Sequence, residues 1–429
     1  MSDIAIVGAG VIGLSLAYEL AGRGLSVRLF DQSQPGQEAS WAGAGMLPPG
    51  NPTPPLTAPA LSPAAALRAA SHALWTDWAQ GLLDETGIDT GYRRCGSWEL
   101  RLKSDPNALD AEIAQLQSEG ILVEPVHPHD LPTREPALSA DVTAAYHLPE
   151  FGQVRNPRLL KALLAGCLAR GVRLHTGTAV HDLVTSPTAS ACATGSASAS
   201  SPETIDHWPD PLPHRSVDPV RAQPTAQAPS HPVRLRTTQG DFEADHVFLA
   251  SGAWTSRLLP TTTSASTPAP SIRPLKGQML LLNQLPLPLT RVINIGSRYI
   301  VPRGDGRILV GSTQEAVGFD KRTTAAAISE LLTFAIEVVP ALARAQLERT
   351  WAGLRPQSAD GLPYLGRLPG HTNLWIAAGH FRDGLQLSPV TAVALADALL
   401  NQQPLVDLTP CAPDRAVGPS PKPKVKSQN

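Results

Sequence analysis

Apolar positions near the N-terminus follow the period of a strand, then that of a helix, then that of a strand again. Residues 4–7 form a short continuous apolar run, which is typical of a strand buried on both faces. Apolar residues then recur at helical spacing over residues 14–21, and Gly22 and Gly24 follow where such a helix would end. A second apolar run at residues 27–30 predicts the next strand. The pattern therefore predicts a β–α–β unit with parallel strands.

Further helix and strand patterns follow in the first half of the chain. Residues 64–83 predict a helix, and residues 96–103 alternate apolar and polar positions as a half-buried strand does. Asn156-Pro157 predicts an N-cap followed by proline in the first helical turn. The helix is then expected over residues 159–170, and it leads into a strand at 172–175.

The second half of the chain carries a buried strand, a hairpin and a final helix. Residues 244–252 contain an apolar run at 247–250 and end in small residues, which indicates a buried strand. Residues 298–311 consist of two apolar runs around Gly304-Asp305-Gly306, a clear hairpin signal. Ser388-Pro389 predicts the start of a helix over residues 390–400.

A long segment of low complexity separates two predicted strands. Residues 186–232 are mostly Ala, Ser, Thr, Pro and short polar residues, so they bury too little surface to offset the entropy of ordering. We expect a disordered insertion there, between strands at 179–184 and 233–237. Residues 260–271 and 404–429 have a similar composition, and they predict shorter segments of the same kind.

These elements predict an α/β plus α+β fold. Parallel βα units at both ends of the chain enclose strands of antiparallel type, so an antiparallel-sheet domain is expected to interrupt a Rossmann-like domain. We assign residues 1–90, 150–185, 233–270 and 345–405 to the dinucleotide-binding domain. Residues 91–149 and 271–344 form the predicted substrate domain, residues 186–232 the insertion, and residues 406–429 a flexible tail.

The loop after the first strand carries the main chemical signal. Gly8-Ala9-Gly10-Val11-Ile12-Gly13 is a GxGxxG motif placed between a strand and a helix, and Asp31 ends the next strand. The glycines allow a tight turn, a close approach of backbone to a pyrophosphate and close helix–strand packing, while the carboxylate suits ribose hydroxyls. The motif therefore predicts dinucleotide binding. The alternative is a glycine-rich turn in an ordinary α/β domain.

Composition narrows the classes of function. The chain has 429 residues, a net charge of −2 and a pI near 6.6, without the basic stripe of a nucleic-acid-binding protein. Its four cysteines are scattered without ligand-like spacing, so neither a metal site nor a redox disulfide is expected. The N-terminus lacks the pattern of a signal peptide, and charges interrupt its apolar stretch before membrane-spanning length. We expect a cytoplasmic protein with no membrane insertion.

Several later segments complete a family pattern. They are residues 39–47, Ser251-Gly252, and residues 351–356, 360–366 and 377–384. With the glycine motif, they resemble the D-amino-acid-oxidase superfamily of FAD oxidoreductases, and within it most closely the glycine oxidases of thiamine (thiazole) biosynthesis. The resemblance covers most of the chain outside the predicted insertion and the tail.

The resemblance implies a non-covalently bound FAD. Sarcosine-oxidase relatives often attach the flavin through a cysteine, but Cys411 lies beyond the flavin motifs. The helix that begins near Ser388 would point its N-terminus at the flavin and favour the anionic reduced ring. The implied cofactor-binding residues are Gly8, Gly10, Val11, Ile12, Gly13, Asp31, Gln32, Ala39, Ser40, Ala44, Gly45, Met46, Val180, Ser251, Gly252, His380, Arg382, Asp383, Gly384, Leu385 and Gln386.

The resemblance also implies the substrate site. Family members move a hydride from the α-carbon of an amino acid to flavin N5, so no acid–base or nucleophilic residue is required of the protein. Arg355 matches the family's carboxylate clamp, Arg382 a second arginine near the substrate, and Tyr299 a tyrosine that touches it. Gln314 stands where relatives tend to carry an apolar residue. It is expected either to bind substrate or to face solvent.

The leading hypothesis is an oxidase of glycine or a small amine or D-amino acid, which gives an imine and reduces O2 to H2O2. The imine would hydrolyse or supply thiazole assembly. The alternatives are a D-amino-acid or sarcosine-type oxidoreductase, a dehydrogenase with a quinone acceptor, and a non-catalytic flavoprotein partner in thiazole assembly. The resemblance leaves a homo-oligomer open.

Overall fold

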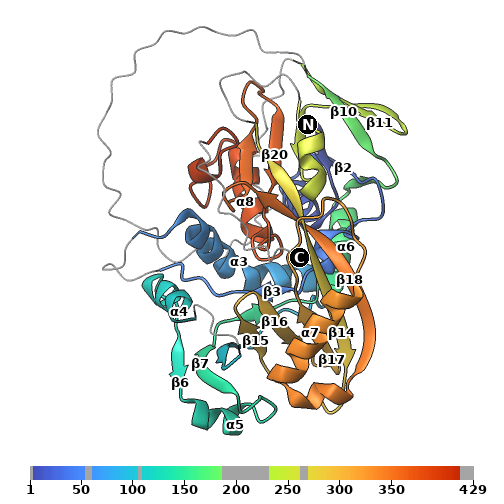
Figure 1. Ribbon diagram of the computed structural model, residues 1–429. Helices are drawn as coiled ribbons and strands as arrows, with labels where there is room; N and C mark the ends of the chain where they lie inside the picture. The colour runs from blue at the N-terminus through green and yellow to red at the C-terminus, as the bar shows by residue number, and fades with distance from the viewer. Residues whose placement is uncertain (1–2, 54–59, 105–108, 186–230, 261–268, 416–429) are drawn as a thin grey trace.

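The computed structural model describes residues 3–53, 60–104, 109–185, 231–260 and 269–415. The predicted insertion therefore lies outside the described residues, apart from its last two positions, and so do most of the segment at 260–271 and the end of the tail. The described part contains two large sheets, one above the other in Figure 1.

The first large sheet is the predicted Rossmann-like one. Its strand order is β19-β20-β13-β1-β2-β9, and all neighbours are parallel except β19 and β20. The predicted β–α–β unit is confirmed, because β1 pairs in register with β2 across α1. The strands are β1 (Asp3–Val7), β2 (Ser26–Phe30), β9 (Arg173–His175), β13 (His246–Leu249), β19 (Tyr364–Arg367) and β20 (Leu374–Ala378).

Helices cover one face of this sheet, and a small meander lies against the other. The helices are α1 (Val11–Gly22), α3 (Pro63–Thr86), α6 (Asn156–Ala169) and α8 (Ser388–Leu399), and they pack against one another over a shared apolar core. The meander consists of β10 (Val180–Val184), β11 (Val233–Thr237) and β12 (Gly240–Ala244). Since β10 and β11 pair antiparallel, the predicted insertion joins neighbouring strands.

The second large sheet has eight strands in the order β18-β14-β17-β16-β15-β5-β7-β6. The predicted antiparallel sheet is confirmed, and β15 and β5 are the one neighbouring pair in it that runs parallel. They come from different parts of the chain, and no hairpin dictates their direction. The strands are β5 (Ser97–Leu102), β6 (Glu124–Val126), β7 (Val142–Leu148), β14 (Ile272–Asn283), β15 (Val292–Ile295), β16 (Arg298–Pro302), β17 (Arg307–Gly311) and β18 (Gln346–Ser358).

One face of the second sheet is closed by α7 (Ala325–Val338), and the other turns toward the first sheet. The predicted hairpin is confirmed as β16 and β17. Strand β18, from the part of the sequence assigned to the dinucleotide-binding domain, pairs with β14 and so belongs to this sheet. The remaining elements are α2 (Ala39–Ala42), α4 (Leu109–Ser118), α5 (Leu131–Arg134), β3 (Met46–Leu47), β4 (Arg93–Arg94), β8 (Gly152–Gln153) and four short 3-10 helices at Pro128–Asp130, Gly252–Arg257, Pro340–Arg344 and Thr409–Cys411.

Two details of the sequence interpretation need correction. Asn156 is the first residue of α6 rather than its N-cap, and its side-chain amide bonds to backbone carbonyls of a neighbouring loop instead. The predicted flexible tail is packed as far as Arg415, whose guanidinium binds both carboxylate oxygens of Asp360 at 2.7 and 2.8 Å. Cys411 in this segment is buried, which raises the pKa of its thiol to about 11.

Candidate functional site

A cavity of about 600 Å³ lies between the two large sheets. The carboxyl ends of β1, β2, β13 and β20 open into it, as expected for the ligand crevice of a parallel sheet. The second sheet forms the opposite wall. The sequence-predicted residues that line the cavity are Gly8, Gly10, Val11, Ile12, Asp31, Gln32, Ala39, Ser40, Ala44, Gly45, Met46, Val180, Ser251, Gly252, Tyr299, Arg355, His380, Arg382, Asp383, Gly384 and Leu385.

Three sequence-predicted residues do not line this cavity. Gly13 faces the glycine loop, where a Cβ would lie 1.8 Å from the carbonyl oxygen of Gly8. Gln386 is buried, and its carbonyl accepts hydrogen bonds from Ser71 and from Trp75 Nε1. Gln314 is half-buried beyond the two residues that contact Arg355. Gly13 thus allows close packing on the glycine loop, and the cofactor role of Gln386 and the substrate role of Gln314 stay predictions.

The glycine loop has the tight geometry that its sequence predicted. Gly8 has φ +110°, and a Cβ there would lie 2.5 Å from the carbonyl oxygen of Ala250. Asp31 Oδ2 accepts a hydrogen bond from the N–H of Ala9 at 2.8 Å, and its Oδ1 accepts one from the N–H of Ser33. The carboxylate therefore fixes the loop that bears the motif and also lines the cavity.

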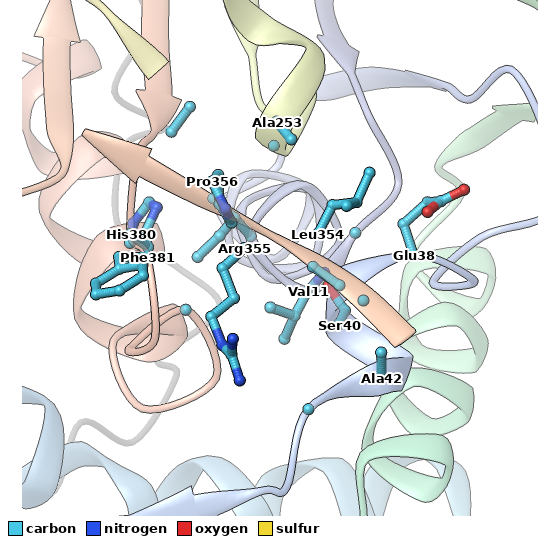
Figure 2. Close-up of a pocket in the computed structure, with 18 of the residues that line it drawn as sticks. Val11, Glu38, Ser40, Ala42, Ala253, Leu354, Arg355, Pro356, His380 and Phe381 are labelled. Carbon is cyan, nitrogen blue, oxygen red and sulfur yellow. The ribbon is translucent and has the colours of Figure 1, made fainter. Parts of the chain in front are cut away.

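Arg355 enters the cavity from β18. Figure 2 shows its side chain projecting from the strand, with His380 and Phe381 on one side and Val11 and Ser40 on the other. Its Nη1 donates to the carbonyl of Thr313 at 3.1 Å, and Nη2 donates to Ser312 Oγ. Gly277 on β14 makes room, because a Cβ there would lie 2.2 Å from Nη1.

A second guanidinium faces the same space. Arg382 is an exposed residue that lines the cavity. The pKa of Arg382 is lowered, first by burial and then by the charge of the neighbouring Arg355. Within the described residues, neither arginine forms an ion pair with a carboxylate. Two adjacent cations in a partly desolvated cavity favour an anionic ligand between them.

Tyr299 lies on β16, and its ring leans over β17. A Cβ on Gly311, the residue paired with it, would lie 2.7 Å from the ring, and the hydroxyl is 3.7 Å from Met279 Sδ. The side chain is buried at the cavity wall. The three sequence-predicted residues Arg355, Arg382 and Tyr299 are thus brought together.

His380 is held neutral at the end of β20. Its ring is 2% exposed, and Nε2 lies 3.0 Å from Thr391 Oγ1. Burial lowers its pKa to about 3. This imidazole therefore helps to line the cavity at neutral pH without adding a charge, and its hydrogen bond is made to Thr391.

The buried His380 predicts a loss of stability in acid. Below pH 6.5 the unfolded histidine takes up a proton, whereas the folded one stays neutral down to about pH 3, so stability falls with pH over that window. Between pH 7 and pH 5 the contribution is about 2 kcal/mol. Urea unfolding at the two pH values is expected to show that His380→Gln reduces the pH dependence by this amount. The exposed His127→Gln serves as control, and an unchanged slope in His380→Gln would contradict the assignment.

Several important wall residues were missed from the sequence. Gly277 lies inside a strand, and a strand glycine often marks a close approach of another group, so a local signal existed. Ser312 and Met279 give no such signal, because their roles depend on the pairing of β14, β17 and β18. Within the described residues, no helix is long and apolar enough to cross a membrane, and no cluster of His, Cys, Asp and Glu could hold a metal ion.

Comparisons with known proteins agree with this geometry. The family model described as FAD-dependent oxidoreductase matches residues 3–398. Glycine oxidase of Pseudomonas aeruginosa is 34% identical over 96% of this chain and 98% of its own length. The bifunctional ThiO/ThiG protein of Synechocystis is 31% identical over 94% of this chain and 52% of its own length. The crystal structure of glycine oxidase from Geobacillus kaustophilus superimposes with a TM-score of 0.79 at 30% identity, and covers 97% of this chain and all of that one. The chain therefore belongs to the DAO family of FAD-dependent oxidoreductases.

Proposed function

We propose that this protein is an FAD-dependent oxidase of glycine or another small amino acid or amine. The observation that carries the proposal is the pair Arg355 and Arg382, two guanidinium groups that face one cavity without a carboxylate partner among the described residues. The carboxylate of an amino acid fits this cationic end. The glycine oxidases among its relatives, which match it over nearly their full lengths, support the same substrate class.

The residues around the cavity fit FAD. The GxGxxG loop and the N-terminus of α1 supply backbone N–H groups for a pyrophosphate. Ala44 and Gly45 also line the cavity, and their N–H groups donate to no group in the described part of the chain. Free amides of this kind suit the electron-rich edge of a flavin ring. When bound, FAD accepts the hydride of the substrate and passes the electrons to O2.

The side chains around the cavity orient the substrate, and the wall at His380 carries no charge. The planar fork of Arg355 binds a carboxylate at two points, which restricts how the α-carbon is presented. Ser312 and Thr313 hold that fork in place. Tyr299 closes the wall beside it, and His380 contributes no competing charge because it is neutral. Positioning and electrostatics are thus the protein's contribution.

The product of this reaction is an imine, formed as the substrate loses a hydride and a proton, while O2 takes up two electrons and two protons to become H2O2. Some relatives are named bifunctional ThiO/ThiG proteins. They contain a region similar to this chain and a second region that the match does not cover. We infer that the imine of glycine is the product that is used further, and that it is supplied to thiazole formation in thiamine biosynthesis. A cytoplasmic location and a homo-oligomer also remain proposals.

Peroxide release by the purified yellow protein tests the function. The panel consists of glycine, sarcosine, D-alanine and D-proline. We expect peroxide with glycine and little with the bulkier D-amino acids. Flavin bleaching under nitrogen without peroxide in air would instead indicate a dehydrogenase with another acceptor. No bleaching with any of the amines would contradict amine oxidation.

A further inference from the structure

The segment at residues 39–46, which lines the cavity, has its carbonyl groups tied back into the protein. Asn156 Nδ2 donates to the carbonyls of Ser40 and Gly43 at 3.0 and 2.7 Å. Trp351 Nε1 donates to the carbonyl of Ala42 at 3.0 Å. The N–H of Val154 donates to the carbonyl of Gly45 at 2.8 Å, and Arg303 Nη2 donates to that of Ala44.

This arrangement determines what the segment presents to the cavity. Because these carbonyls point into the protein, the cavity side receives the N–H groups of Ala44 and Gly45, which donate to nothing in the described residues. Gly45 has φ +66°, and a Cβ there would lie 2.1 Å from the carbonyl oxygen of Val154. Donor groups from distant elements therefore fix the backbone orientation from the side that faces away from the cavity.

Arg303 is the unusual member of this set. It is 7% exposed, and its Nη1 donates to Gln153 Oε1 at 2.9 Å and to the carbonyl of Val154 at 3.0 Å. Within the described residues it has no ion pair with a carboxylate. Burial, followed by the charges of Arg155 and Arg93, lowers its pKa to about 9. Burying a cation without an anion is costly, so its contacts must have a use that an apolar side chain would not supply.

The position of Arg303 in the chain suggests that use. It directly follows β16, the strand that carries Tyr299 in the substrate wall. Its guanidinium reaches Ala44 in the segment at residues 39–46 and the β8 region at Gln153 and Val154. One side chain thus connects the substrate-facing sheet with the backbone that faces the cofactor.

We propose that Arg303 is a positioning residue that holds the Ala44–Gly45 backbone in its cofactor-binding orientation. It also fixes the position of this backbone relative to β16, the strand that bears Tyr299. It touches neither cofactor nor substrate. It acts by fixing the Ala44 carbonyl away from the cavity, so that the adjacent N–H groups face FAD. The effect on FAD rests on the family assignment, and only the effect on substrate rests on the proposed function.

The test compares Arg303→Lys and Arg303→Met with Arg307→Met. Arg307 lies on the same hairpin, and its substitution by methionine removes the same charge. Its side chain, however, is 45% exposed and pairs with Asp305 and Glu348. The readouts are the dissociation constant of FAD from the apoprotein, measured by quenching of flavin fluorescence, the absorption spectrum of bound flavin, and the unfolding temperature of the apoprotein. Arg303→Met is expected to weaken FAD binding about ten-fold or more and to shift the flavin spectrum, since it removes charge-assisted hydrogen bonds.

Arg303→Lys retains the charge and most of the side-chain volume. It therefore still tests the proposal if Arg303→Met does not fold. We expect it to weaken FAD binding several-fold with little change in the unfolding temperature. Unchanged FAD affinity in a folded variant would overturn the proposal, as would an equal loss in Arg307→Met. If no amine is oxidised by the wild type but the FAD effect persists, the proposed function fails and the role of Arg303 stands.

Discussion

Replacing Arg355 by alanine is expected to raise the KM for the amino-acid substrate about 100-fold or more, while FAD stays bound. The side chain reaches the cavity from β18 and bonds within the protein only to Ser312 Oγ and the Thr313 carbonyl in the described residues. Its remaining donors are available for a carboxylate, and hydrogen bonds between charged groups are the strong ones. Steady-state kinetics of peroxide formation, with the flavin spectrum recorded for each variant, measures the effect.

Two further variants separate the guanidinium fork from its charge. Arg355→Lys keeps the charge but loses the planar fork, so an intermediate increase of KM is expected. Gly277→Ala places a Cβ 2.2 Å from Nη1, where the guanidinium now lies. It should therefore raise KM by displacing the Arg355 side chain, although Arg355 itself is not substituted. Arg273→Ala on the neighbouring strand removes an exposed charge and serves as control. Unchanged kinetics in Arg355→Ala would remove the clamp from the site.

Local sequence patterns predicted the elements that carry the cofactor side of the cavity. The apolar runs at β1 and β2, the helical spacing of α1 and the glycine motif between them depend on neighbours within a few residues. The hairpin of β16 and β17 was equally visible, since its turn lies between the strands it joins. The resemblance then added Arg355, Arg382 and Tyr299, which the structure places around one cavity.

The supporting contacts could not be predicted in the same way. Asn156 looked like a helix cap, but its amide holds Ser40 and Gly43, more than 100 positions earlier in the chain. Ala44 and Arg303 are separated by 259 positions, and only the folded sheets bring them into contact. The parallel pairing of β15 with β5 has the same origin. Local periodicity specifies which face of an element is buried, but not which distant partner covers it.

Replacing Gly13 by alanine is expected to destabilise the protein by about 3 kcal/mol or more and to weaken FAD binding at least 100-fold. The added Cβ would lie 1.8 Å from the carbonyl oxygen of Gly8, which is backbone and cannot swing aside as a side chain could. Helix α1 would have to move away from the glycine loop, and the N–H groups at its start would move with it. Urea unfolding and titration of the apoprotein with FAD measure the two effects.

Gly81 provides the matched control for this substitution. It lies inside α3, and a Cβ there meets no atom within 4 Å. Since alanine is the better helix former, Gly81→Ala should stabilise the protein by about 1 kcal/mol and leave FAD affinity unchanged. The same chemical change in two helices is thus expected to have opposite effects, because only α1 needs its glycine for close contact. Equal behaviour of the two variants would show that the packing of α1 on the loop does not control the cofactor site.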